Sequence, residues 1–371
     1  MTIKLHEPSY DEEEIQAVVD VLRSKNVTMG EKVREFEDTF ARMFNHKHAV
    51  SCNSGSSANL LAVAAMVALG RLRRGDEVVV SALSWSTTVA PLFQYGLVPV
   101  FVDCDLETLN IDNAAVKQAL SPSVKAIMPI HCYGNAADLT EFTDYPVIED
   151  ACESMSANYA GIPVGRFGVC GTFSFYFSHH VTTLEGGMVV TGDAELADMM
   201  RVQRAHGWQR DIAPERWQHV HGIDDRFLFV DTGYNLRLSE PQAAMGLVQL
   251  TKLQGFVERR RALLAILKTR LECSGVAVQR ETPGGYSSAF GCPLIGSPGL
   301  REKVEAHGIE TRPIIAGNLV HHPAIRKYPH RVSGSLANAD EVLMNGFAVP
   351  CHQGMSDDDA HYIADCVLKS H

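Results

Sequence analysis

Four short segments of the sequence hold polar side chains at the ends of apolar runs, where a bound ligand would be reached. The segment 53–58 (Asn-Ser-Gly-Ser-Ser-Ala) precedes an apolar helical run. Its small residues would present backbone N–H groups and hydroxyls that suit a phosphate group, although an ordinary serine N-cap has the same sequence. The segment 147–151 ends an apolar run on Asp150. A buried carboxylate there needs a cationic partner, either an arginine or a protonated pyridine nitrogen kept as an electron sink.

The other two segments contain an aromatic side chain and two adjacent imidazoles. Trp85 follows the apolar run 77–81, and its ring would stack on a planar ligand or pack in the core. His179 and His180 lie between two predicted strands. Imidazole exchanges protons near neutral pH, so the pair suits proton transfer, with a solvent-facing pair as the alternative. Adjacent histidines lack the spacing of metal ligands and no Cys-x-x-Cys pair occurs, so the sequence predicts no metal site.

Alternating strands and helices must position these segments. Short β-rich runs predict strands at 77–81, 98–102, 126–129, 147–149, 171–175 and 187–191. Helical patterns occupy 11–23, 33–44, 57–69, 88–95, 113–120 and 194–205. This alternation predicts an α/β fold with a mostly parallel sheet covered on both faces. Ligands of such sheets bind beyond the carboxyl ends of the strands, where we expect the four segments to lie.

The alternation of predicted strands and helices ends near residue 250. A long helical stretch, 240–270, is followed by Gly/Pro/Ser-rich segments around a short predicted strand at 289–293. We therefore expect two domains, an N-terminal arm with a large domain (1–250) and a small α+β domain (251–371).

Composition excludes several classes of function. The 371 residues carry a net charge of −11, so the chain lacks the basic surface of a general nucleic-acid or anionic-membrane binder. The longest apolar run, 60–69, is too short to cross a bilayer, and the first ten residues do not resemble a signal peptide. Nine cysteines scattered through apolar stretches indicate free buried thiols, so we expect a cytoplasmic protein.

In this order and spacing, the four segments resemble the DegT/DnrJ/StrS family of pyridoxal-phosphate sugar aminotransferases. Further matches lie at 14–37, 233–246 and 308–313, so the resemblance covers essentially the whole chain. It implies fold type I, with a mixed, mostly parallel seven-stranded sheet in the large domain. It also implies that Ser56, Ser57 and Ser174 bind the cofactor phosphate. Asn235 matches an Asn that reaches the phosphate of a neighbouring subunit, which implies a homodimer with shared active sites.

The resemblance also assigns the residues around the cofactor ring. Trp85 would stack on the ring, Asp150 would pair with its nitrogen, and Glu153 stands where the family usually has Gln near the ring hydroxyl. Family aminotransferases bind the cofactor through a lysine, but that position holds His179, and no lysine occurs between Lys125 and Lys252. Imidazole moves protons but cannot form a stable Schiff base.

This lysine-to-histidine change resembles one branch of the family, the nucleotide-sugar 3-dehydratases that use pyridoxamine phosphate. The match extends to 177–180, 185–187, 206–208 and 311–318. Some members of the branch carry an iron–sulfur cluster. The stretch 210–229 contains no cysteine, so this chain resembles the type without a cluster.

The resemblance implies removal of the C3 hydroxyl from a nucleotide-linked 4-keto-6-deoxyhexose, as in the 3,6-dideoxysugars of lipopolysaccharide O-antigens. His179 would move a proton from the cofactor and return one to the leaving hydroxyl, with His180 as the weaker candidate for that acid. Glutamate would restore the amine. The sequence leaves the nucleotide open between GDP, CDP and dTDP. Arg210, Arg312 and Asn318, with His180, are candidate substrate contacts, and a surface role is the alternative for the arginines.

Two other functions compete with this interpretation. One is a true nucleotide-sugar 4-aminotransferase whose lysine comes from an unexpected place in the chain. The other is an inactive homologue that binds the cofactor or the sugar. The presence of Ser57, Trp85, Asp150 and Asn235 argues against an inactive homologue, because all four suit cofactor binding.

Overall fold

A seven-stranded sheet forms the centre of the computed structural model, which describes residues 2–371. Its strands, in spatial order, are β1 (His48–Cys52), β9 (Gly187–Thr191), β8 (Cys170–Ser174), β5 (Ile148–Asp150), β4 (Val124–Met128), β2 (Glu77–Ser81) and β3 (Val98–Val102). Two single bridges, Ile127–Val147 and Ile130–Asp150, join β4 to β5. Within this sheet β9 runs antiparallel to β1 and β8, and the other pairs are parallel. The two-residue β13 (Arg331–Val332) extends the β3 edge.

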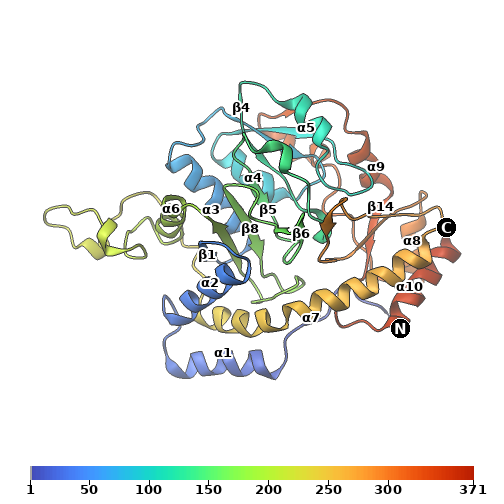
Figure 1. Cartoon of the computed structure of the whole chain (residues 1–371), viewed down its shortest axis with the longest axis horizontal. Helices are drawn as coiled ribbons and strands as arrows, with labels where there is room; N and C mark the ends of the chain where they lie inside the picture. Colours follow the sequence, from blue (N-terminus) through green and yellow to red (C-terminus); the bar gives the residue numbers. More distant parts are fainter. Residues whose placement is uncertain (1) are drawn as a thin grey trace.

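Helices cover both faces of the sheet because its strands are apolar on both sides (Figure 1). One face carries α3 (Gly55–Ala68), α4 (Ser86–Gln94) and α6 (Ala194–Arg204). The other face carries α2 (Glu31–Met43), α5 (Asn113–Ala119) and the first half of α7 (Glu240–Leu271). Val189 packs toward the first set and Val190 toward the second, as expected from the alternation of side chains along a strand.

The α/β class and the mixed, mostly parallel seven-stranded sheet predicted from the sequence are confirmed. The predicted strands and helices are present with bounds that differ by at most three residues. The edge strand β1 was not predicted. Its sequence, His-Ala-Val-Ser-Cys, lacks a marked pattern, and it is defined by its pairing with β9.

The C-terminal part of the chain is built on α7, which is 32 residues long (Figure 1). Its second half packs with α8 (Leu300–Ala306), α10 (Asp357–Ser370) and a three-stranded sheet of β10 (Ala277–Val278), β12 (Cys292–Ile295) and β14 (Gly346–Val349). The N-terminal helix α1 (Glu12–Ser24) lies along the first half of α7. Ile3 of the N-terminal arm pairs with Ile309, so the arm reaches the C-terminal part.

The division between the two parts lies inside α7. Side chains up to Val257 pack with the large domain, whereas those from Leu263 pack with the C-terminal core. The boundary proposed near residue 250 therefore falls within one continuous helix. After β12 the chain returns to the large domain, because Ile314, Leu319 and the helix α9 (Ala337–Asn345) contribute to its core.

The segment between α6 and α7 projects away from the body of the molecule, at the left of Figure 1. The bridges Ala205–Asn235 and Trp208–Phe229 join the two sides of its stem. Four of its apolar side chains are exposed: Val220, Ile223, Phe227 and Phe229.

The remaining short elements are β6 (Asn158–Tyr159), β7 (Ile162–Pro163), β11 (Gly285–Tyr286) and six 3₁₀ turns at Cys132–Gly134, Thr140–Phe142, Pro214–Arg216, Asp225–Phe227, Leu319–His321 and Ile325–Lys327. Over residues 2–371, no helix combines the length and the apolar character needed to cross a membrane.

Candidate active site

A cavity of about 480 Å³ opens beyond the carboxyl ends of the strands. It collects residues from β5, β8, the start of α3 and the C-terminal part of the chain. Of the cofactor-binding and catalytic residues predicted from the sequence, six line it: Ser56, Trp85, Asp150, Glu153, Ser174 and His179. Arg312 lines it as well, so one candidate substrate contact lies beside these six.

The N-terminus of α3 forms one wall of the cavity. Ser54 is the N-cap, and Gly55 follows so tightly that a Cβ there would lie 2.6 Å from Cβ of Ser174. The glycine therefore lets the Ser174 side chain lie against the first turn of the helix, where the backbone N–H groups favour an anion. Ser56 is exposed and shares a 2.8 Å hydrogen bond with Thr87. This wall fits a phosphate group.

Ser57 lies outside the cavity lining. Its backbone N–H donates to Ser54 Oγ at 3.0 Å, and its hydroxyl donates to Asn53 Oδ1 at 2.7 Å. Both donors are therefore used within the N-cap itself. Ser54 therefore has the capping role that was the alternative for this segment, with Ser57 as its hydrogen-bond donor, and Ser56 lines the cavity.

Asp150 is the buried charge of the site. Its side chain, 2% exposed, ends β5 and accepts hydrogen bonds from Asn59 Nδ2 (2.8 Å), Thr88 Oγ1 (2.6 Å) and the backbone N–H of Cys152 (3.1 Å). These donors are neutral, and no Lys, Arg or His of residues 2–371 forms an ion pair with Asp150. A buried carboxylate held by neutral donors alone suits an incoming cation.

Trp85 supplies an exposed aromatic surface at the same cavity. It stands directly before α4, is 45% exposed and lines the cavity, so it is not the core residue that was its alternative. An anion site at α3, a free carboxylate and an aromatic face around one space match the phosphate, the ring nitrogen and the ring of pyridoxal phosphate. The residues present therefore fit the cofactor that the resemblance implies.

His179 lines the cavity with its ring held by aromatic neighbours. It meets Tyr176 and Phe290 edge to face, with ring centroids 5.8 Å and 5.0 Å away. Its buried Nδ1 finds no hydrogen-bond partner among the described residues. Burial, together with the positive charges of Arg312 and Arg260, lowers the pKa of His179 to about 3. The imidazole is therefore neutral at physiological pH, the form in which a ring nitrogen has a free lone pair.

His180 points elsewhere. Its Nε2 makes a 2.9 Å hydrogen bond with the carbonyl oxygen of Ser288, and burial lowers its pKa well below the usual value. It is 1% exposed and does not line the cavity. Of the two adjacent histidines, the geometry therefore presents His179 to a ligand and uses His180 in packing.

Glu153 is a buried carboxyl group on the cavity wall. It accepts a 3.1 Å hydrogen bond from the backbone N–H of Tyr133. Burial raises the pKa of Glu153 to about 7, against the opposing effect of the Arg312 charge. Near neutral pH the group therefore exists in both protonation states and can donate or accept a hydrogen bond.

Three other predicted contacts lie away from this cavity. Asn235 is exposed at the stem of the projecting segment, and Arg210 is exposed with its guanidinium 4.3 Å from the ring centre of Trp208. Asn318 is buried, donates to Asp340 at 2.7 Å and caps a short 3₁₀ turn. Asn318 is thus held within the fold, whereas the two exposed residues are available to a neighbouring subunit.

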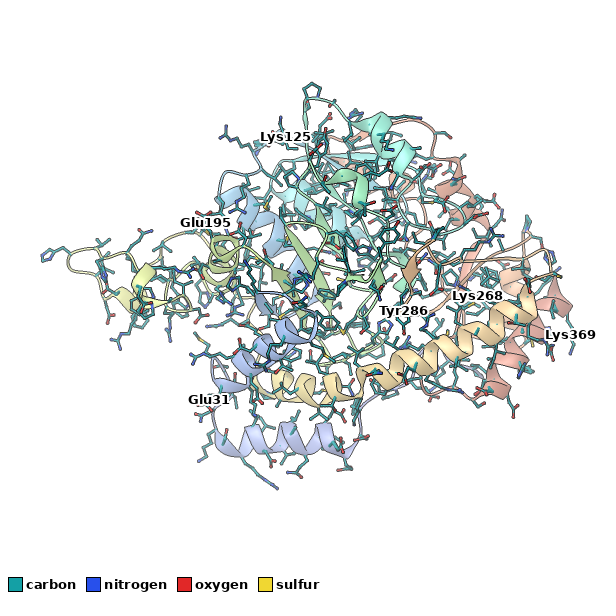
Figure 2. The ribbon with its side chains drawn as sticks, viewed as in Figure 1. Glu31, Lys125, Glu195, Lys268, Tyr286 and Lys369 are labelled. Atoms are coloured by element: carbon teal, nitrogen blue, oxygen red, sulfur yellow. The ribbon has the colours of Figure 1, made fainter. Side chains whose placement is uncertain are left out.

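No lysine lines the cavity. Lys125 lies on β4 and donates to the carbonyl oxygen of Pro122, and Lys252 is paired with Asp11 and Glu14. Figure 2 places Lys125 at the outer end of the sheet and Lys268 far along α7. The position expected for a lysine is therefore taken by His179.

Sequence reasoning missed several residues that complete the site. Asn59 and Thr88 orient Asp150, and Tyr176 lines the cavity beside His179. Arg260 lies on α7 with its charge close enough to affect His179. The position of Thr88 shortly after Trp85 was a weak indication that it belongs to the site. Asn59 and Arg260 lie in helical runs whose sequence gave no such indication.

Comparison with known proteins gives a consistent result. The sequence profile of the DegT/DnrJ/EryC1/StrS aminotransferase family matches residues 8–368. GDP-4-keto-6-deoxy-D-mannose 3-dehydratase of Yersinia pseudotuberculosis is 40% identical over 368 residues, which cover 93% of each chain.

Solved structures agree with this match. The Escherichia coli GDP-4-keto-6-deoxy-D-mannose-3-dehydratase with bound hydrated PLP superposes with a TM-score of 0.93 at 38% identity, covering 99% of this chain and 100% of the other. A structure of such a dehydratase with a trapped PLP–glutamate geminal diamine has a TM-score of 0.93 at 38% identity and covers 98% and 99% of the two chains.

Proposed function

Because this chain belongs to the DegT/DnrJ/EryC1/StrS aminotransferase family, we propose from its site that it is a PLP-dependent nucleotide-sugar 3-dehydratase. It removes the C3 hydroxyl of a nucleotide-linked 4-keto-6-deoxyhexose and belongs to deoxysugar biosynthesis. The observation that carries this assignment is His179, a neutral imidazole on the cavity wall in the place of the family's lysine. An aminotransferase needs that lysine, so transamination of the sugar is not favoured.

The residues of the cavity would hold the cofactor in one orientation. The phosphate would lie at the N-terminus of α3, against the N–H groups near Gly55 and the hydroxyls of Ser56 and Ser174. Trp85 would stack on the ring, and Asp150 would pair with the ring nitrogen. When bound, the cofactor supplies an amine for the sugar's keto group and a cationic ring that accepts electrons.

His179 would move the proton on which the reaction depends. Its ring lines the cavity in the neutral form, which is the form that a general base must have before it takes a proton. The same environment that lowers its pKa makes the protonated ring a strong acid. Once charged, His179 would therefore readily return the proton to the departing C3 hydroxyl, and one residue would serve as base and then as acid.

The nucleotide and the amino donor follow from the relatives. The curated relative described above is named for a GDP-linked substrate, and one solved structure contains glutamate joined to PLP. GDP-4-keto-6-deoxymannose is therefore the proposed substrate, and glutamate is the proposed donor. Nine free cysteines, eight of them buried or half-buried, fit a reducing compartment such as the cytoplasm.

A homodimer with shared sites is supported by the projecting segment. Its exposed apolar side chains, such as Phe227 and Phe229, would be covered by a second copy of the chain. Asn235, exposed at the stem, would then reach the neighbouring cofactor phosphate. Arg210 is exposed in the same segment and is the proposed substrate contact there.

The test is product analysis with purified protein. The protein, loaded with pyridoxamine phosphate, is incubated with GDP-4-keto-6-deoxymannose and glutamate, and the sugar product is identified by mass spectrometry. We expect a 3,6-dideoxy-4-ketosugar. A 4-amino sugar would indicate the aminotransferase alternative, and an unchanged substrate would indicate an inactive homologue. CDP- and dTDP-linked substrates in parallel reactions test the choice of nucleotide.

A further inference from the structure

A second, smaller cavity adjoins the candidate active site. It measures about 250 Å³ and shares Tyr176, Ser178 and Arg312 with the larger cavity. The N-terminal arm covers it with Leu5 and His6. Much of its remaining lining is apolar, with Phe177, Phe290, Val349 and Cys351, and one further charged residue, Arg260, faces it. We refer to this space as the annex.

Arg260 is a buried cation without an anionic partner. Its side chain is 2% exposed, and it donates to three neutral oxygens: Gln353 Oε1 at 2.8 Å and the carbonyls of Phe290 and Cys351 at 2.8 Å and 3.2 Å. No Asp or Glu of residues 2–371 forms an ion pair with it. Burial lowers the pKa of Arg260 to about 10. An unpaired buried charge is costly, so an anionic ligand in the annex would be stabilised by it.

Arg312 stands where the annex meets the larger cavity. Its backbone is fixed by two hydrogen bonds with Ala348, at 3.2 Å and 2.8 Å. Its guanidinium makes no side-chain hydrogen bond or ion pair within the described chain. The positive charges of Arg312 and Arg260 both lower the pKa of His179, so both guanidiniums lie near the imidazole. Two available cations, one at the mouth and one inside, face a space whose other lining is largely apolar, with His6, Tyr133, Tyr176 and Ser178 as the polar exceptions.

We infer that the annex is the binding site for the distal carboxylate of a dicarboxylic amino donor. Arg260 binds that carboxylate, Arg312 at the mouth binds the carboxylate next to the amine, and the apolar lining contacts the methylene groups between them. The donor's amine then lies in the larger cavity beside His179. The site selects a short dicarboxylic amino acid over one with a neutral side chain.

The dimensions and the lining of the annex favour this ligand over a nucleotide. Its volume is below the range of about 300–1,000 Å³ that is typical of drug-sized ligands, and a nucleoside diphosphate is larger still. The phosphates would also need more donors than one buried guanidinium offers. The inference rests on the proposed function, because a donor is needed only if the cofactor's amine is consumed.

The test compares Arg260→Met with Arg261→Met. Arg261 is adjacent on α7 but pairs with Glu281 and stacks on Tyr286, outside the annex, so it is a matched control. The probes are glutarate, with two carboxylates, and valerate, with one, both measured by calorimetry on the PLP-loaded protein. Arg260→Met should weaken glutarate binding roughly 10- to 100-fold, the effect of one hydrogen bond to a charged group. Valerate and GDP should bind as before, and Arg261→Met should change neither probe.

The half-reaction gives a second readout. Loss of the visible absorbance of PLP should be faster with glutamate than with alanine in the parent protein, and Arg260→Met should remove most of that preference. Unchanged glutarate affinity, or an equal loss of GDP affinity, in Arg260→Met would overturn the inference. If the variant does not fold, a crystal structure of the parent protein with glutarate decides. A carboxylate on Arg260 supports the inference, and an annex without one refutes it.

Failure of the proposed function would look different. Dehydration by protein preloaded with pyridoxamine phosphate needs no donor, so it reports on the sugar reaction alone. If that reaction fails while the affinity for glutarate still depends on Arg260, the donor site is supported and the proposed sugar substrate is wrong.

Discussion

Asn59 holds Asp150 in a fixed orientation through a 2.8 Å hydrogen bond from its amide nitrogen to the carboxylate. The amide oxygen of Asn59 in turn accepts a 2.6 Å hydrogen bond from Thr172 on β8. The amide therefore cannot rotate without losing one of the two bonds. Through this pair, α3 and β8 together set the direction of the buried charge.

Removing the other side-chain donor to Asp150 should weaken the site. Thr88→Val keeps the shape of the side chain but removes the 2.6 Å hydrogen bond to the carboxylate. Because a hydrogen bond to a charged group contributes about 1.5–3 kcal/mol, we expect PLP affinity to fall by roughly tenfold or more. Absorbance titration measures this. Thr251→Val, on the exposed face of α7, is the control and should bind PLP normally.

No covalent bond should join the cofactor to the resting protein. The cavity contains no lysine, so borohydride reduction of the PLP-loaded protein should leave the mass of the chain unchanged. Intact-mass spectrometry before and after reduction provides the measurement. A phosphopyridoxyl-lysine peptide would contradict the dehydratase assignment.

Substitution of His179 should separate cofactor binding from catalysis. His179→Asn keeps a polar side chain of similar size but cannot move a proton, so the rate should fall by about 10²–10⁴-fold while PLP still binds. His361→Asn, exposed on α10, is the control. His179→Lys should hold PLP as a Schiff base and shift the product toward a 4-amino sugar. Near-normal 3-deoxygenation by His179→Asn would show that another residue carries the proton.

Stability without cofactor should depend on pH through Glu153. Burial raises the pKa of this carboxyl from about 4.5 to about 7, so the folded state binds its proton more tightly than the unfolded state does. The stabilisation is therefore complete below about pH 4.5 and is lost as pH rises through about 7. Glu153→Gln should remove this contribution, so its melting temperature should fall less than that of the parent protein between pH 5 and pH 8. Identical pH profiles would contradict the assignment.

Shared active sites predict complementation. A heterodimer of His179→Asn and Asn235→Ala contains one site with both changes and one site with neither. Equal mixing after subunit exchange should therefore restore about one quarter of the parent activity, although each variant alone is weak. The activity of a mixture that never exceeds the mean of its components would argue against a contribution of Asn235 to the neighbouring site.

Much of this architecture was predictable because the signals were local. Apolar runs identified the inner strands, and Asp150 and Trp85 follow such runs, so their place at the sheet edge followed from chain order. The different roles of Ser56 and Ser57 could not be predicted from chain order, because they depend on which hydroxyl turns toward the N-cap. The match to the family motif selected His179 over His180 for catalysis, whereas the contact of His180 with Ser288 became visible only in the fold.

Arg260 illustrates what sequence patterns leave undetermined. Three consecutive arginines, Arg259 to Arg261, occupy the middle of α7 and look alike in the sequence. Arg259 pairs with Asp357 and Arg261 with Glu281, both contributed by distant segments. Only the packing of those segments leaves Arg260 facing inward without an acidic partner, so its role was visible only in three dimensions.

The unbroken course of α7 has a mechanical consequence. At 1.5 Å per residue, its 32 residues form a rod about 48 Å long that belongs to both halves of the molecule. A rod of this kind has no hinge, so the two halves cannot rotate freely about the predicted boundary without breaking helical hydrogen bonds. Any movement that accompanies ligand binding would then be confined to shorter pieces, such as the N-terminal arm that covers the annex. Because α7 joins the two halves rigidly, they would keep their relative orientation when a ligand binds.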